Sequence, residues 1–113
     1  MAFKFVKKLS IQWPVEVLVP ADGGTTEKQE FTARFHILDE TTFMKNADAA
    51  KDDKEFISGF LIGWSDLADE EGNEIPFSDD MRDQLVSQSY IKVAILKAYK
   101  KATNGIGDPA TKN

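Results

Sequence analysis

Cysteine is absent from this chain and histidine occurs once, so several kinds of site are excluded at the start. Without thiols the protein has no disulfide framework and no thiolate zinc site. A histidine that acts as a general base or metal ligand usually has a positioned partner, but His36 lies beside Arg34 in an alternating segment and lacks one. Because every nucleophile would need that one imidazole, no Ser-His-Asp combination stands out, and we interpret His36 as a surface residue.

Long apolar runs are missing as well. The longest, residues 56–64, is too short and too interrupted to span a bilayer. The first eight residues interleave lysines with apolar side chains, which is not the pattern of a signal peptide. We therefore expect no membrane segment, and the lack of cysteine is compatible with a reducing cytoplasm.

Glycine motifs that bind phosphate or calcium are incomplete. Gly23-Gly24 lacks the later glycine, the lysine and the helix of a phosphate-binding loop. Aligning Gly72 with the invariant glycine of a calcium loop puts Leu67 and Ser78 where the first oxygen ligand and the bidentate glutamate belong. We expect no metal site, no cofactor and no catalytic residues, and we predict that the protein is not an enzyme.

Basic residues are few in the middle of the chain. Residues 39–83 hold four lysines or arginines against fourteen acidic residues, whereas residues 84–113 hold five against one. An acidic centre with no arginine-rich or aromatic-interleaved basic face argues against binding DNA or RNA. The acidic block is either a solvated, solubilising surface or a docking surface for a basic partner.

Two segments with alternating apolar residues predict an antiparallel β-hairpin near the N-terminus. Between them, Gly23-Gly24 permits a turn, and Pro14 indicates an edge strand because proline cannot donate a ladder hydrogen bond. Residues 3–6 are expected to add a third strand. The apolar residues that share one face of the hairpin are Leu9, Ile11, Trp13, Val15, Val17 and Val19, then Phe31, Ala33, Phe35 and Ile37.

After Ile37 the apolar period lengthens and predicts helices. Asp39 is an N-cap candidate for a short helix through about Lys45, followed by a polar turn. The stripe from Phe56 to Leu67 predicts one amphipathic helix. Its two glycines, Gly59 and Gly63, indicate the close approach of another backbone or a frayed helix end.

Two further helices and a tail complete the chain. Ser78 caps the first, and the second carries a stripe from Ile91 to Ala102 and ends at Asn104-Gly105. Residues 106–113 have too little apolar content to fold and are expected to be a disordered tail. The predicted class is α+β: a small antiparallel hairpin or three-stranded sheet, followed by three to four α-helices packed on it, in one domain of residues 1–105.

The segment from Trp64 to Phe77 leads from one helix, through an acidic Gly/Asn turn, to the start of the next. It contains no catalytic or ligand-binding pattern. We expect residues 69–74 to face water and the two aromatic residues to be buried, so that they hold the loop against the core.

Several of these segments together resemble the tail assembly chaperones of long-tailed double-stranded-DNA phages and prophages. The resemblance covers residues 11–103, and Ser89-Tyr90 departs from it, because many relatives have a proline there. In the first half it rests on Trp13-Pro14-Val15, Val19-Pro20, Asp22-Gly23-Gly24 and Phe31-Thr32-Ala33-Arg34-Phe35. In the second half it rests on Phe60-Leu61-Ile62-Gly63-Trp64, Asp69-Glu70-Glu71-Gly72, Ile75-Pro76-Phe77-Ser78 and Ala98-Tyr99.

The resemblance implies a protein without enzymatic activity that binds the phage tape measure protein and helps to deliver the tail tube protein. It further implies a protein that acts in the host bacterial cytoplasm and is absent from the mature virion, and it leaves a homo-oligomer open. The alternative that we carry is a minor structural tail or connector protein of the virion. For partner binding we predict a groove between the Phe56–Leu67 helix and the last helix, lined by Phe56, Phe60, Trp64 and Tyr99.

Overall fold

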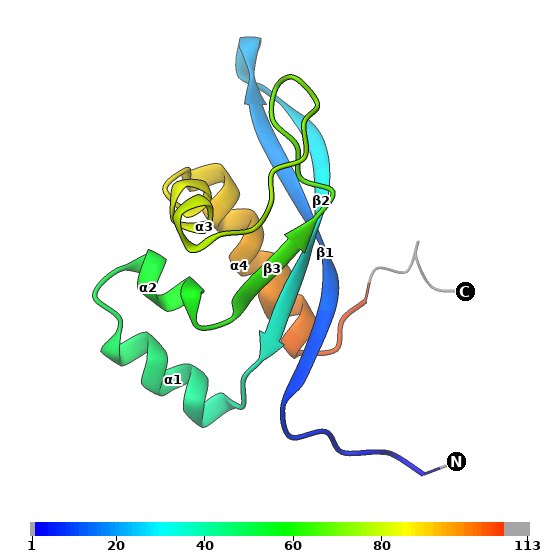
Figure 1. The fold of residues 1–113 in the computed structure, drawn as a ribbon, viewed down its shortest axis with the longest axis vertical. Helices are drawn as coiled ribbons and strands as arrows, with labels where there is room; N and C mark the ends of the chain where they lie inside the picture. Colours follow the sequence, from blue (N-terminus) through cyan, green and yellow to red (C-terminus); the bar gives the residue numbers. More distant parts are fainter. Residues whose placement is uncertain (1, 108–113) are drawn as a thin grey trace.

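The structure, a computed structural model, describes residues 2–107 and has the predicted α+β architecture, with a three-stranded antiparallel sheet and four α-helices. Figure 1 shows a long β-hairpin whose tip projects beyond the helices. The elements in chain order are β1 (Leu9–Ala21), the short 3-10 turn η1 (Asp22–Gly24), β2 (Thr25–Ile37), α1 (Glu40–Ala49), α2 (Asp53–Ser58), β3 (Leu61–Ser65), α3 (Asp79–Val86) and α4 (Ser89–Thr103).

The predicted hairpin is confirmed. β1 pairs with β2 without interruption, from Leu9 opposite Ile37 to Ala21 opposite Thr25. Gly23 and Gly24 close it with φ angles of 79° and 78°, which a residue with a side chain rarely adopts. The odd-numbered apolar residues of both strands share one face, and the helices pack on that face to form the core.

The third strand is not the predicted one. Phe3–Val6 belong to no helix or strand, and β3 instead pairs with β2 on the side opposite β1, giving the order β1-β2-β3. A β-bulge interrupts this pairing, because Arg34 lies opposite Gly63 while Phe35 lies opposite Leu61. The extra residue, Ile62, is 42% exposed, whereas Leu61 before it is fully buried in the core.

The single helix predicted from Phe56 to Leu67 is also wrong. α2 ends at Ser58, and the chain then turns at Gly59 and Phe60 and enters β3. Glycine is a poor helix former, which favours a stop at this point. A Cβ added to Gly59 would lie 3.2 Å from the side chain of Asn46 in α1, so the glycine also permits the close approach of α1.

α1 and α3 begin at the predicted caps. The side chains of Asp39 and Ser78 accept hydrogen bonds from the N–H groups of Thr42 and Met81 at the starts of α1 and α3. α1 runs one turn beyond its predicted end, to Ala49. α4 ends as predicted, and Gly105, with a φ angle of 69°, reverses the chain after it.

The predicted tail of residues 106–113 falls mostly outside the described residues. Its first residue, Ile106, donates its N–H to the carbonyl of Lys101 at 2.9 Å, and Gly105 donates to Ala102 at 3.2 Å. These two bonds form the Schellman motif that closes α4. They hold Ile106 beside the last turn of that helix.

The loop after β3 is anchored less deeply than the sequence predicts. Trp64 and Phe77 are half-buried rather than buried, and their rings meet edge to face with centroids 4.7 Å apart. The indole N–H of Trp64 donates to the carbonyl of Ile75 at 2.8 Å. Asp69 organises the acidic turn by accepting the N–H groups of Glu71 and Asn73, both at 2.9 Å.

Candidate partner-binding groove

The four residues predicted to line a groove belong instead to the core or its margin. Phe60 and Tyr99 are buried and stack on each other, with ring centroids 3.8 Å apart. Phe56 is half-buried against Phe60, and Trp64 is half-buried in the sheet. Because the helix that was to form one wall is replaced by α2 and β3, the predicted groove does not form between these residues.

The aromatic cluster is closed on its outer side by α1. Phe43, from the middle of that helix, lies 5.9 Å from the ring of Tyr99 and 5.2 Å from the ring of Phe56, measured between centroids. The hydroxyl of Tyr99 accepts the N–H of Leu38 at 3.0 Å and donates to the carbonyl of His36 at 3.1 Å. Burial raises the pKa of the Tyr99 hydroxyl above its ordinary value of 10.0.

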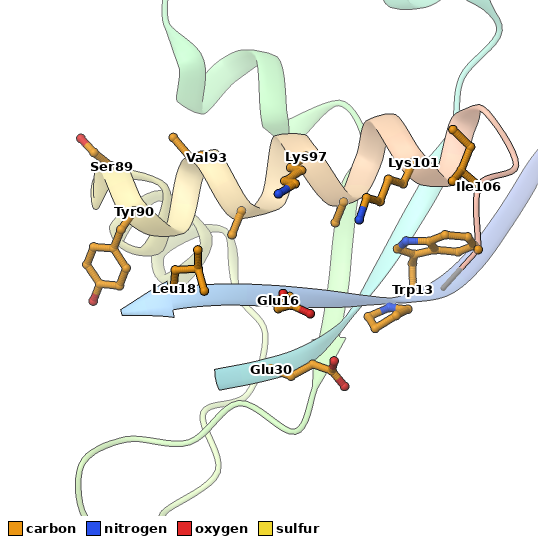
Figure 2. Close-up of a pocket in the computed structure, with 14 residues that line it drawn as sticks. Trp13, Glu16, Leu18, Glu30, Ser89, Tyr90, Val93, Lys97, Lys101 and Ile106 are labelled. Carbon is orange, nitrogen blue, oxygen red and sulfur yellow. The ribbon is translucent and has the colours of Figure 1, made fainter. Parts of the chain in front are cut away.

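An open groove is present elsewhere, between α4 and the outer edge of β1 (Figure 2). Its volume is about 560 Å³, within the range of sites that receive a ligand or a partner segment. Its apolar lining comes from both walls and from the chain that follows α4. The residues of this lining are Trp13, Leu18, Tyr90, Val93, Ala94, Ala98 and Ile106.

Several of these apolar side chains are open to solvent. Val93 is 59% exposed, Ile106 is 56% exposed and Leu18 is 49% exposed, and all three line the groove. Leu18 and Val93 lie toward one end of it and Ile106 toward the other (Figure 2). α4 places Ile95, Ala98 and Tyr99 in the core and therefore turns a second stripe toward the groove. That stripe contains Tyr90, Val93, Lys97 and Lys101, which are three or four residues apart.

The two walls of the groove differ in charge. In Figure 2, Lys97 and Lys101 point from α4 toward β1, while Glu16 and Glu30 lie on the sheet side. Glu16 and Glu30 are directly opposite each other across β1 and β2. Lys28 forms an exposed ion pair with Glu16 at 3.3 Å, and so it offsets only part of this acidic pair.

The outer edge of β1 is one long side of the groove, and its backbone groups lack a strand partner within residues 2–107. The N–H of His36 donates to the carbonyl of Phe60, on the side of β2 that faces away from β1. Because successive residues of a strand point their backbone groups to alternate sides, all even-numbered residues of β2 point theirs away from β1. Odd-numbered residues of β2 lie opposite odd-numbered residues of β1, as Phe35 does with Ile11. The even-numbered residues of β1 must therefore point their N–H and C=O groups outward, toward the free edge.

This assignment explains the positions of the two prolines in β1. Pro14 and Pro20 are both even-numbered, so each removes an N–H from the free edge and none from the pairing with β2. Between them, Glu16 and Leu18 retain their outward N–H groups. The two prolines therefore bound a short section of the edge that is open to additional pairing.

The groove holds no constellation suited to catalysis. Its charged side chains are exposed lysines and glutamates, and its other polar side-chain groups are two hydroxyls and the indole N–H of Trp13. Over the part of the chain that the structure describes, no three His, Asp or Glu side chains gather to hold a metal ion. Within the same residues, no helix is both long and apolar enough to cross a membrane.

Comparison with known proteins adds no relative: no family model, curated protein or solved structure matches the chain.

Sequence reasoning missed the groove because it assigned α4 a single buried stripe. Tyr90 and Val93 carried a signal that was available, since they extend the apolar surface of the helix beyond the residues needed for the core. Leu18 was a second signal, because it is an apolar residue at a position of β1 that otherwise alternates to the polar face. Only the packing of α4 against β1 shows that the two signals belong to one surface.

Proposed function

We propose that this chain is a phage tail assembly chaperone that binds the tape measure protein and assists assembly of the tail tube, without catalysing a reaction. The observation that carries the proposal is the groove between α4 and β1, where Leu18, Val93 and Ile106 are left exposed along its length. A contiguous apolar surface bordered by charge is typical of a protein that receives another polypeptide. The family resemblance of residues 11–103 supplies the identity of that polypeptide.

The groove is chemically matched to an amphipathic helix. A tape measure protein is a long, helix-rich chain whose apolar stripes require cover before assembly. Such a stripe would pack against Trp13, Leu18 and Val93. Acidic residues beside the stripe would face Lys97 and Lys101, and basic residues on its other side would face Glu16 and Glu30.

This function places the protein in the cytoplasm of the host bacterium during assembly and outside the mature virion. The tail tube protein is the second partner that the resemblance implies. The competing function, a minor structural tail or connector protein, would use the same groove for a permanent neighbour in the particle.

Mass spectrometry of purified phage particles separates these two functions. A chaperone is made in the infected cell and is missing from the particles, whereas a structural subunit appears in them at a fixed ratio to the tube protein. The major tube protein serves as the internal standard. Detection of this chain at constant stoichiometry in washed particles would overturn the chaperone proposal and favour the structural one.

A further inference from the structure

The residues before β1 form an apolar arm that the rest of the chain leaves uncovered. Residues 2–8 have no helix or strand structure, and Figure 1 shows this segment leading away from the sheet. Phe3 is 90% exposed and Phe5 is 75% exposed, and Val6 follows them. Large aromatic side chains at such exposure, two residues apart, mark a segment that has a partner.

The arm has the pattern of a half-buried strand. Phe3 and Phe5 would lie on one face, and Lys4 would lie on the other between them. The two sides of the β1 edge match these two faces, one being apolar and the other acidic. On the α4 side of that edge the groove is apolar. Glu16 and Glu30, which border the groove from the sheet side, lie beside each other on the other face of the sheet.

We propose that residues 2–6 of a second copy of this chain add as a strand to the free edge of β1, across Pro14–Leu18. In this arrangement Lys4 of one copy lies opposite Glu16 of the other. Phe3 and Phe5 then enter the groove beneath α4, where Val93 and the aliphatic parts of Lys97 and Lys101 cover them. The outward backbone groups of Glu16 and Leu18 gain hydrogen-bond partners.

Charge favours the same register. Like charges placed directly opposite each other on a sheet are destabilising, and Glu16 and Glu30 form such a pair at the edge. The ammonium group of Lys4 on the added strand would lie beside Glu16 and offset this repulsion.

The arm of the same chain cannot occupy this position. Val6 would have to lie next to either Pro14 or Leu18, depending on strand direction, whereas β1 begins at Leu9. The five residues from Leu9 to Pro14 span about 17 Å of strand, since each residue advances about 3.3 Å. The three residues from Val6 to Leu9 reach about 11 Å at most. A second copy must therefore supply the arm.

This self-association is expected of the protein when no partner is bound. It does not depend on whether the partner is a tape measure protein. Light scattering coupled to size-exclusion chromatography measures it directly. The wild-type protein is expected to exceed the monomer mass of 12.6 kDa as concentration rises. The double variant Phe3→Ser/Phe5→Ser should raise the dissociation constant about tenfold or more, because it removes most of the apolar area that the arm buries.

Two further variants test the surface and the register. Met44→Ser removes a similarly exposed apolar residue from α1, outside the groove, and should leave self-association unchanged. Lys4→Glu and Glu16→Lys should each weaken association, and the two together should restore it, because the charge pair is then reversed. General effects on solubility do not produce such a restoration. Circular dichroism verifies that every variant is folded.

Because the chain has no cysteine, the contact can also be trapped chemically. A mixture of Lys4→Cys and Glu16→Cys proteins should form a disulfide between the two variants under mild oxidation, since directly paired strand residues lie at disulfide distance. Glu71→Cys, on the exposed loop after β3, is the control partner and should react much less. A monomer mass at every concentration, or equal cross-linking of Lys4→Cys to both partners, would overturn the proposal.

Discussion

The ring of Tyr99 stacks on the ring of Phe60, with centroids 3.8 Å apart, and so joins α4 to the residue that precedes β3. Removing the ring by Tyr99→Ala should cost about 3–5 kcal/mol of unfolding free energy, the usual range for a buried aromatic residue. Tyr99→Phe keeps the ring but leaves the N–H of Leu38 without its acceptor, and should cost about 1–2 kcal/mol. Urea denaturation measures both, with Tyr90→Phe in the groove as a control expected within about 0.5 kcal/mol of wild type.

The same hydroxyl predicts a dependence of stability on pH. Burial raises the pKa of Tyr99 above 10.0, so the unfolded state loses this proton at a lower pH than the folded state does. The contribution of Tyr99 to stability is therefore complete below pH 10 and is lost as the pH rises above it. Denaturation midpoints between pH 8 and 11 should fall more steeply for wild type than for Tyr99→Phe. Parallel curves for the two proteins would contradict this assignment.

α1 should depend on a single side chain for its docking. None of its residues is buried, and Phe43 is the side chain through which it reaches the aromatic cluster. Phe43→Ala should remove most hydrogen-exchange protection from residues 40–49 and leave the hairpin and α4 protected. Met44→Ala, which changes the exposed neighbour, is the control and should leave the protection of α1 in place. Uniform loss of protection over the whole chain in Phe43→Ala would contradict a local role.

The loop after β3 should tolerate charge changes better than changes to its aromatic anchors. Glu71→Lys alters an exposed side chain and should change the unfolding free energy by less than about 0.5 kcal/mol. Trp64→Ala loses the contact with Phe77 and the hydrogen bond to Ile75, and should cost about 2 kcal/mol or more, although the ring is only half-buried. Thermal melts of both variants decide the point, and equal melting temperatures would contradict this view of the loop.

Local signals in the sequence were sufficient for the hairpin and for the helix caps. A period of two between Leu9 and Ile37 has few competing interpretations, because one face of each strand is buried and the other is polar. Asp39 and Ser78 act within three residues of their own positions. Features of this kind do not depend on the rest of the fold, and the structure confirms them.

The segment from Phe56 to Leu67 could not be assigned in the same way. Its apolar spacing fits one continuous helix. It fits equally well the observed succession of a short helix, a turn at Gly59 and a bulged strand. The choice is made by β2, whose second edge accepts β3 as a partner. That pairing is a long-range contact, and it also explains why the expected groove at Phe60 became part of the core.

The groove between α4 and β1 was beyond prediction for a related reason. It exists because α4 packs close to an edge strand and uses only part of its apolar surface to do so. Neither Val93 nor Leu18 reveals this alone. Its position was set by tertiary packing, and the sequence pattern of either element does not contain that information.

Co-expression of this protein with the tape measure protein tests most directly whether the groove between α4 and β1 receives that partner. The measured quantity is the soluble fraction of the tape measure protein from the same phage or prophage, produced with wild type, Val93→Asp or Met44→Asp. Both substitutions add a charge at an exposed apolar site on a helix, but only Val93 lies in the groove. We expect wild type and Met44→Asp to keep the tape measure protein soluble and to co-purify with it, and Val93→Asp to fail in both. Equal solubility with all three proteins, or with none, would contradict binding at this groove.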